Sequence, residues 1–181
     1  MIAGLRGTVG EHLGDGVVVL EVQGVGYEVH LATPTPPTAG ETIAVAVYTA
    51  VRDDAIVLYG FATYAERALF GTLLATPGVG PSTALAALRT LTRERLVAAI
   101  DAGDVATLTL VPGIGAKTAQ RIVLELRGKV TDAGDSIGPD VREALQRLGY
   151  GPADLRRLEG VELPSDEAEA LREALRVMGR S

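Results

Sequence analysis

The sequence predicts a chain of the α+β class in which a small β-barrel comes first and two groups of helices follow. Three observations support this order. Short apolar and β-branched runs fill residues 1–62, and helical periodicity with two Pro-Gly-x-Gly motifs fills residues 63–130. A polar segment rich in helix-breaking residues then precedes residues 140–181, which are again helical in pattern. We therefore expect a barrel, a paired helix–hairpin–helix domain, a linker at 131–139 and a three-helix domain.

The composition narrows the class of protein. The 181-residue chain is 47% hydrophobic but only 4% aromatic, so its cores must be built mainly from aliphatic side chains. It has no cysteine, which excludes disulfides and thiolate metal ligands. It shows no signal-peptide pattern and no apolar run of about 18 residues, so we expect a cytoplasmic protein with no membrane span.

The net charge of −6 is unevenly distributed along the chain. Residues 1–62 carry two basic and seven acidic side chains, residues 63–132 carry eight and six, and residues 133–181 carry seven and ten. The segment that holds both Pro-Gly-x-Gly motifs is thus the one with a net positive charge. Because local charge matters more than the total for nucleic-acid binding, this distribution is compatible with DNA as a ligand.

Five strands are expected in the first 62 residues. Apolar runs at 2–9, 17–22, 25–31, 43–51 and 56–61 are separated by turn signals at 14–16, 24, 34–37 and 52–54. Five short strands in about 60 residues favour a small closed barrel. The alternation of residues 27–31 fits a strand with one buried face.

Helices are expected to begin at Tyr64 and after Thr92, and to cover 82–88, 104–110 and 116–127. Thr92 is suited to an N-cap, with Glu94 in the first turn. The order helix, hairpin, helix therefore occurs twice.

The two hairpins, Pro77-Gly78-Val79-Gly80 and Pro112-Gly113-Ile114-Gly115, are the main functional signal. In each, two glycines form the turn, the apolar residue between them points inward, and backbone N–H groups at the next helix start can bind a phosphate. A single motif of this kind is most simply a helix connection, but a second copy with matching small residues favours phosphate binding. Such binding would not depend on base sequence. A valine at Gly113 or Gly115 is expected to obstruct the turn and weaken binding without unfolding the chain.

The predicted DNA-binding residues lie in and just after the two hairpins: Gly78, Val79, Gly80, Ser82, Thr83, Gly113, Ile114, Gly115, Lys117, Thr118 and Arg121. Lys117 stands where the first copy has Ser82, so we expect the second hairpin to make the stronger electrostatic contact. A nucleotide-binding P-loop is not expected, because Ala116 separates Gly115 from Lys117.

Residues 140–181 are expected to form helices at 140–148, 153–158 and 166–177. About 40 residues is near the lower limit for independent folding, so a docking role is more plausible than a catalytic one. The residues Leu145, Leu148, Tyr150, Leu171 and Leu175 form either its core or an apolar patch for a partner. The sequence does not separate these two possibilities.

The chain resembles the RuvA family of Holliday-junction-binding subunits. The resemblance spans nearly the whole chain and is carried by segments 1–7, 24–29, 51–55, 58–61 and 66–70, by both hairpins and by 144–150. It implies an OB-fold at 1–62, a tandem helix–hairpin–helix domain at 63–130 and a UBA-like domain at 140–181. It also implies a homotetramer, in some members an octamer, which binds four-way junctions and works with the ATPase RuvB and the endonuclease RuvC. The linker at 131–139 is short for this family.

The resemblance also changes the interpretation of Asp53 and Asp54. From residues alone this pair is an ordinary solvated hairpin tip, whereas the family implies an acidic pin that repels phosphates at the junction centre. A metal site there is not expected, since no third ligand is evident. His12 and His30 are expected at the surface or in the barrel. No cofactor and no catalytic residues are expected.

Two other functions stay open from the residues. A generic helix–hairpin–helix module of a repair enzyme or nuclease would cleave junction DNA with Mg²⁺ and no partner. A purely structural adaptor would show no salt-sensitive binding to four-way junctions.

Overall fold

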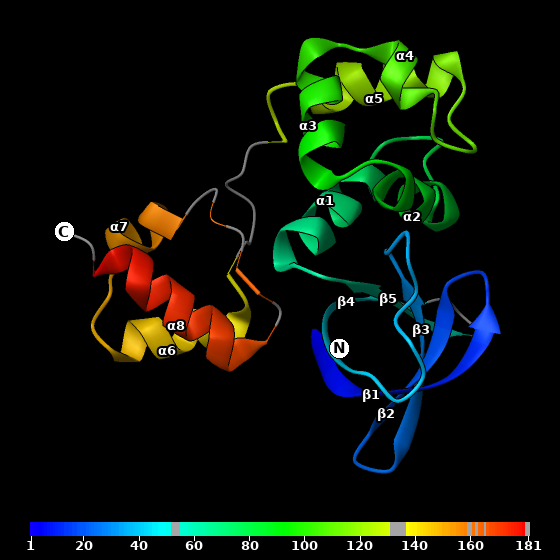
Figure 1. Cartoon of the computed structure of the whole chain (residues 1–181). Helices are drawn as coiled ribbons and strands as arrows, with labels where there is room; N and C mark the ends of the chain where they lie inside the picture. The colour runs from blue at the N-terminus through cyan, green and yellow to red at the C-terminus, as the bar shows by residue number, and fades with distance from the viewer. Residues whose placement is uncertain (52–54, 131–136, 159–160, 162, 165, 180–181) are drawn as a thin grey trace.

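The computed structural model describes residues 1–51, 55–130, 137–158, 161, 163–164 and 166–179. Figure 1 shows a barrel, a helical region stacked on one end of it, and a separate group of helices at its side. Within the described part of the chain, no helix has the length and apolar character needed to cross a membrane.

The N-terminal region is a closed five-stranded barrel, as predicted. Its strands are β1 (Gly4–Gly14), β2 (Val17–Val22), β3 (Val25–Leu31), β4 (Thr42–Val51) and β5 (Ile56–Phe61). They follow the order β1-β2-β3-β5-β4 around the barrel. All neighbouring pairs are antiparallel except β3 and β5, which run parallel. β1 is longer than the predicted 2–9, because it continues past irregular pairing near His12 to the β1–β2 turn.

The barrel has two apolar faces because side chains alternate along each strand. Inward-facing aliphatic residues from β1 to β5 fill the interior. Outward-facing Tyr48, Tyr59 and Phe61 instead surround Phe70 of α1 (Tyr64–Leu74), with ring centroids 5.2, 5.0 and 4.9 Å away. The barrel and the helical region therefore share one continuous hydrophobic core.

The helical region contains α1, α2 (Pro81–Thr90), α3 (Arg93–Ala102), α4 (Val105–Leu108) and α5 (Ala116–Leu126). The expected start of α3 is confirmed, because the Thr92 side chain accepts a hydrogen bond from the Arg95 N–H. α1 begins with a reciprocal capping box between Thr63 and Glu66. The predicted helix at 104–110 is shorter, and Asp104 is its cap.

The C-terminal group contains α6 (Pro139–Arg147), α7 (Pro152–Leu155), a 3-10 turn at Arg156–Leu158 and α8 (Glu167–Met178). These elements enclose a core of their own. Ile137, which the sequence places in the linker, is buried in that core. On α8 the buried residues are Ala170, Ala174 and Met178, whereas Leu171 and Leu175 are half-buried.

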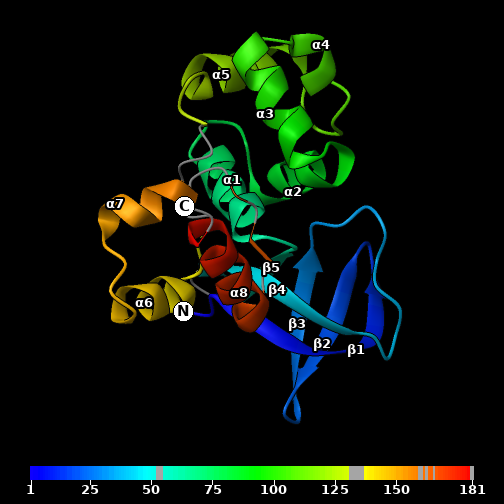
Figure 2. The ribbon, with the colours of Figure 1, turned by 60° about the vertical axis from the view of Figure 1, so that its left-hand side comes forward.

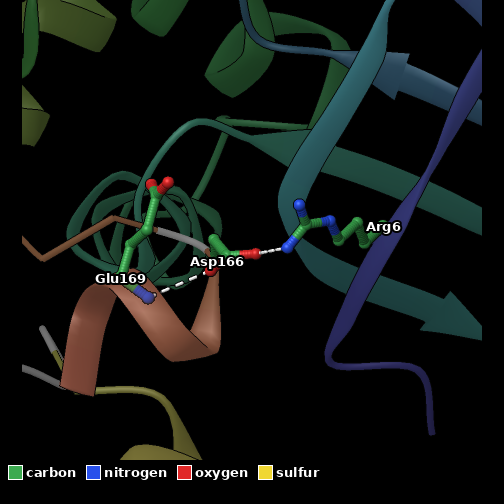
Figure 3. Close-up of polar contacts among 3 residues, drawn as sticks. All are labelled: Arg6, Asp166 and Glu169. Carbon is green, nitrogen blue, oxygen red and sulfur yellow. Dashed lines mark hydrogen bonds and ion pairs between the residues drawn. The ribbon is translucent and has the colours of Figure 1, made fainter. Parts of the chain in front are cut away.

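The C-terminal group stands beside the barrel (Figures 1 and 2) and touches β1 and the start of α1 through a few residues. The Arg6 guanidinium on β1 forms an ion pair with the Asp166 carboxylate at the start of α8 (Figure 3). An isolated β-bridge joins Thr63 to Pro164, and Gly138 lies over the Tyr64 ring. Burial and the nearby carboxylates of Glu167 and Asp140 raise the pKa of Tyr64.

Candidate nucleic-acid interface

The two hairpins have nearly identical backbones. We call residues 77–80 hairpin 1 and residues 112–115 hairpin 2. The first glycine of each has a positive φ, +89° at Gly78 and +86° at Gly113. The second is extended, with φ, ψ of −91°, 172° at Gly80 and −84°, 171° at Gly115. Each second glycine is the N-cap of the following helix, so the repeat seen in the sequence is a repeat in three dimensions.

The apolar residue in each hairpin is buried, as predicted. Val79 and Ile114 are 6% and 4% exposed. The Val79 N–H donates to the Thr76 carbonyl at 3.0 Å, and the Ile114 N–H donates to the Val111 carbonyl at 3.0 Å. Each loop is thus closed by one backbone hydrogen bond and anchored by one buried side chain.

The helix starts behind both hairpins present N–H groups that no side chain caps. Neither α2 nor α5 has a side-chain hydrogen bond at its N-cap. The first N–H groups of a helix lack partners within the helix and carry the positive end of the helix dipole. A phosphate is a suitable ligand for this arrangement.

The hairpins are also close neighbours. The Arg121 Nη1 on α5 donates to the Pro77 carbonyl of hairpin 1 at 3.2 Å. Hairpin 2 likewise lies close to α2, because a Cβ added at Gly113 would be 3.4 Å from the Thr83 hydroxyl. Arg121, predicted as a phosphate contact, therefore also links the two loops. Its guanidinium has five N–H donors, so one bond to Pro77 leaves others for DNA.

The two glycines of a hairpin tolerate substitution differently, which corrects one sequence-based expectation. Gly113 has a left-handed backbone, so valine there strains the chain whatever the space around it. At Gly115 φ is negative and an added Cβ meets no atom within 4 Å. Only the substitution at Gly115 therefore obstructs the loop without straining the backbone.

The positive charge of the helical region is smaller near the hairpins than the sequence suggested. The Arg67 Nε donates to the Val47 carbonyl on β4 at 2.6 Å, and the Arg89 Nε donates to the Leu31 carbonyl on β3 at 2.8 Å. Both side chains face the barrel. The other six basic residues of 63–132 are matched by six acidic ones. The net charge of residues 63–132 therefore does not show how much positive charge lies near the hairpins. The cations beside hairpin 2 are the exposed Lys117 and Arg121.

Asp53 and Asp54 lie outside the described residues. The strands on either side end at Val51 and begin at Ile56, whose side chains are 74% and 68% exposed. The predicted acidic pin accordingly stays a prediction.

The five residues predicted for partner docking do not form one patch. Leu145 is fully buried in the C-terminal core, which agrees with the first of the two possibilities that the sequence left open and makes it a poor candidate for a partner contact. Leu148 is 60% exposed at the end of α6. Tyr150, Leu171 and Leu175 are half-buried around the same core.

Neither histidine belongs to a metal cluster, because the described residues include no group of three potential ligands. His12 lies on β1, and the half-buried His30 on β3 is 5.4 Å from the Tyr59 ring. Burial lowers the pKa of His30, with opposing influence from Glu28.

Two family models match the two regions just described. One, described as RuvA N terminal domain, covers residues 1–60, and another, described as SAM-like helix-hairpin-helix tandem, covers residues 70–129. Full-length relatives named Holliday junction branch migration complex subunit RuvA match along nearly the whole chain. The chain belongs to the RuvA family.

Three RuvA relatives illustrate the extent of the similarity. The protein of Anaeromyxobacter sp. is 42% identical over 97% of this chain and 98% of its own length. The protein of Chloroflexus aggregans is 38% identical over 98% of this chain and 96% of its own length. The protein of Geobacter metallireducens is 35% identical over 98% of this chain and 99% of its own length. The full-length RuvA match includes the C-terminal helices, which neither family model covers.

Sequence reasoning missed three features of the RuvA-type site. It did not foresee that Arg67 and Arg89 face the barrel, because an arginine on a helix gives no sign of its partner. It also missed the buried Thr76 hydroxyl, which has no hydrogen-bond partner among the described residues. Aligning the two repeats could have drawn attention to Thr76, since the matching position in the second copy is Val111.

Proposed function

We propose that this chain binds four-way DNA junctions through the phosphate backbone, independently of base sequence. The observation that carries the proposal is the pair of adjacent hairpins with matching backbones and uncapped helix starts. Such a surface binds phosphates by their position in space, and phosphate contacts carry no direct information about base sequence. Family membership supports the junction as the branched structure that is bound, since the relatives are named subunits of a Holliday junction branch migration complex.

In this proposal the chain is a DNA-binding subunit and not an enzyme. Four copies hold the four arms with two hairpins each and keep the junction open and flat, and two such tetramers can face each other as an octamer. The acidic pair Asp53 and Asp54 discourages duplex from crossing the centre. The RuvB ATPase supplies the energy for branch migration, and RuvC resolves the junction. This work takes place in the cytoplasm, as part of recombination and repair.

The C-terminal helical group recruits the ATPase in this scheme. Leu148 is the best candidate for direct contact, because it is a large apolar side chain that is exposed. Tyr150, Leu171 and Leu175 extend the contact where they are accessible. The predicted division into three domains joined by a linker is proposed together with this role.

The test is binding of the Gly115→Val variant to a four-way junction and to duplex of equal length. We expect junction affinity to fall about tenfold or more, because the valine side chain occupies the phosphate position and removes a charge-assisted contact. The melting temperature should fall only slightly, since Gly115 has an allowed backbone and open space around it, and the cost is that valine is a weaker N-cap than glycine.

The matched control is Ala98→Val, which adds similar bulk at an exposed position on α3, an element that contains neither hairpin. It should bind like the wild type. Unchanged junction affinity in folded Gly115→Val would contradict the assignment of hairpin 2. Cleavage of labelled junction by the chain alone with Mg²⁺ would contradict a purely binding role.

A further inference from the structure

Arg89 links the helix that carries hairpin 1 to the barrel. Hairpin 1 caps the N-terminus of α2, and Arg89 is the penultimate residue of the same ten-residue helix. Its Nε donates to the Leu31 carbonyl at 2.8 Å, and its Nη2 lies 3.4 Å from the Gly16 carbonyl. One side chain thus joins the end of α2 to two segments of the barrel.

The Leu31 and Gly16 carbonyls lie next to each other in the barrel. The Leu31 N–H itself donates to the Gly16 carbonyl at 2.9 Å, so the end of β3 and the β1–β2 turn are already tied together there. Gly16 leaves the space that the guanidinium needs, since an added Cβ would lie 2.6 Å from Nη2. Asp15, in the same turn, attracts the Arg89 charge.

The contact is specific to a partly buried guanidinium. Burial lowers the pKa of Arg89, so the charged form pays a desolvation cost that its hydrogen bonds must offset. Two fixed acceptors suit the fork of N–H groups on an arginine, and a lysine could serve only one of them in the same geometry.

The packing of α2 shows why this link matters. α1 packs directly on β4 and β5 through its aromatic core, whereas the main helix contacts of α2 in the described chain are with α1 and α3. Arg89 therefore gives α2 a direct polar link to the barrel. The angle of α2 sets where hairpin 1 stands relative to the barrel.

We propose that Arg89 is a positioning residue that holds hairpin 1 in the orientation required to distinguish a junction from duplex DNA. This inference rests on the proposed function. A protein that binds only phosphates recognises a branched structure by the relative positions of its contacts. Loosening α2 therefore affects selectivity more than it affects binding to any single duplex.

The test combines a distance measurement without DNA and a binding measurement with it. The chain has no cysteine, so Ser82→Cys on α2 and Thr42→Cys on β4 give two unique sites for spin labels. We expect Arg89→Met to broaden the distribution of distances between these labels. In the unlabelled protein, the ratio of junction to duplex affinity should fall about tenfold, within the range of coupling between two sites, while duplex affinity stays the same.

Two further variants serve as controls. Arg89→Lys keeps the charge and can reach one of the two carbonyl acceptors, so it should restore part of the selectivity and remain folded. Arg127→Met removes the same charge at the far end of α5 from hairpin 2 and should change neither measurement.

Unchanged distances, or broadened distances with unchanged selectivity, would overturn the positioning role of Arg89. A wild-type protein that does not prefer junction over duplex would instead overturn the proposed function. The two failures are therefore distinguishable.

Discussion

Hairpin 1 and hairpin 2 match in their backbone angles but differ in the residues around them. Both have a left-handed first glycine, an extended second glycine and a buried aliphatic residue between them. After hairpin 1 come Pro81 and Ser82, whereas after hairpin 2 come Ala116 and Lys117. Before hairpin 1 lies Thr76, and the matching residue before hairpin 2 is Val111.

This comparison separates the geometry of the loop from its chemistry. The shared backbone is fixed by two glycines and one buried side chain, so it tolerates different neighbours. The neighbours decide how many N–H donors and how much positive charge the loop presents. Proline has no N–H, so α2 begins with one donor fewer than α5. We therefore expect hairpin 2 to be the better phosphate site, because it has one more N–H donor and one more cation than hairpin 1.

The largest expected effect comes from exchanging the residues that precede the loops. The buried Thr76 hydroxyl has no hydrogen-bond partner in the described part of the chain, so Thr76→Val should raise the free energy of unfolding by about 1 kcal/mol. Val111→Thr should lower it by about 2 kcal/mol, because it buries a new hydroxyl in an apolar site. Chemical denaturation measures both changes. Equal effects of the same sign would show that the two sites do not differ as the structure indicates.

Exchanging the charges after the loops tests the electrostatic difference. Lys117→Ser should weaken junction binding about tenfold and reduce the slope of log affinity against log salt by about one for each bound protomer. Ser82→Lys should strengthen binding and raise the slope, because it places a cation beside hairpin 1. Titrations at several salt concentrations measure both slopes. If Lys117→Ser left the slope unchanged, hairpin 2 would not be the stronger contact.

The smallest expected effect concerns the missing N–H of α2. Pro81→Ala supplies one more donor at hairpin 1 and should tighten junction binding by about twofold, less than a full hydrogen bond provides in water. Stability should change little, since proline is already well suited to the first helical position. A gel-shift titration beside Ala116→Pro, expected to weaken binding by a similar factor, checks the result. Changes of the same sign for this pair would contradict the role given to these N–H groups.

The fold was more predictable than the site. Alternating strands and turn residues gave three of the five strands their observed ends, and Thr92 marked the start of α3 correctly. These features depend on local sequence. The longer β1 depends on irregular pairing with β2, which local sequence does not reveal.

Side-chain direction explains most of the remaining errors. Leu145 has the apolar character of either a core or a surface contact, and only packing shows that it is buried. Arg67 and Arg89 count as positive charge in any sequence window, yet they bind carbonyls of strands 20 and 58 residues away in the chain. Long-range partners of this kind cannot be read from spacing.

The Asp166 carboxylate at the start of α8 performs two tasks with its two oxygens. Oδ1 accepts the Glu169 N–H at 3.0 Å and completes the helix cap, while Oδ2 receives Arg6 from the barrel. The Arg6 side chain is 67% exposed, so this ion pair is expected to contribute only about 1 kcal/mol or less. If the pair with Arg6 breaks, α8 keeps its cap. The cap of α8 therefore does not depend on the ion pair with β1. The contact between α8 and β1 can break without the loss of that cap.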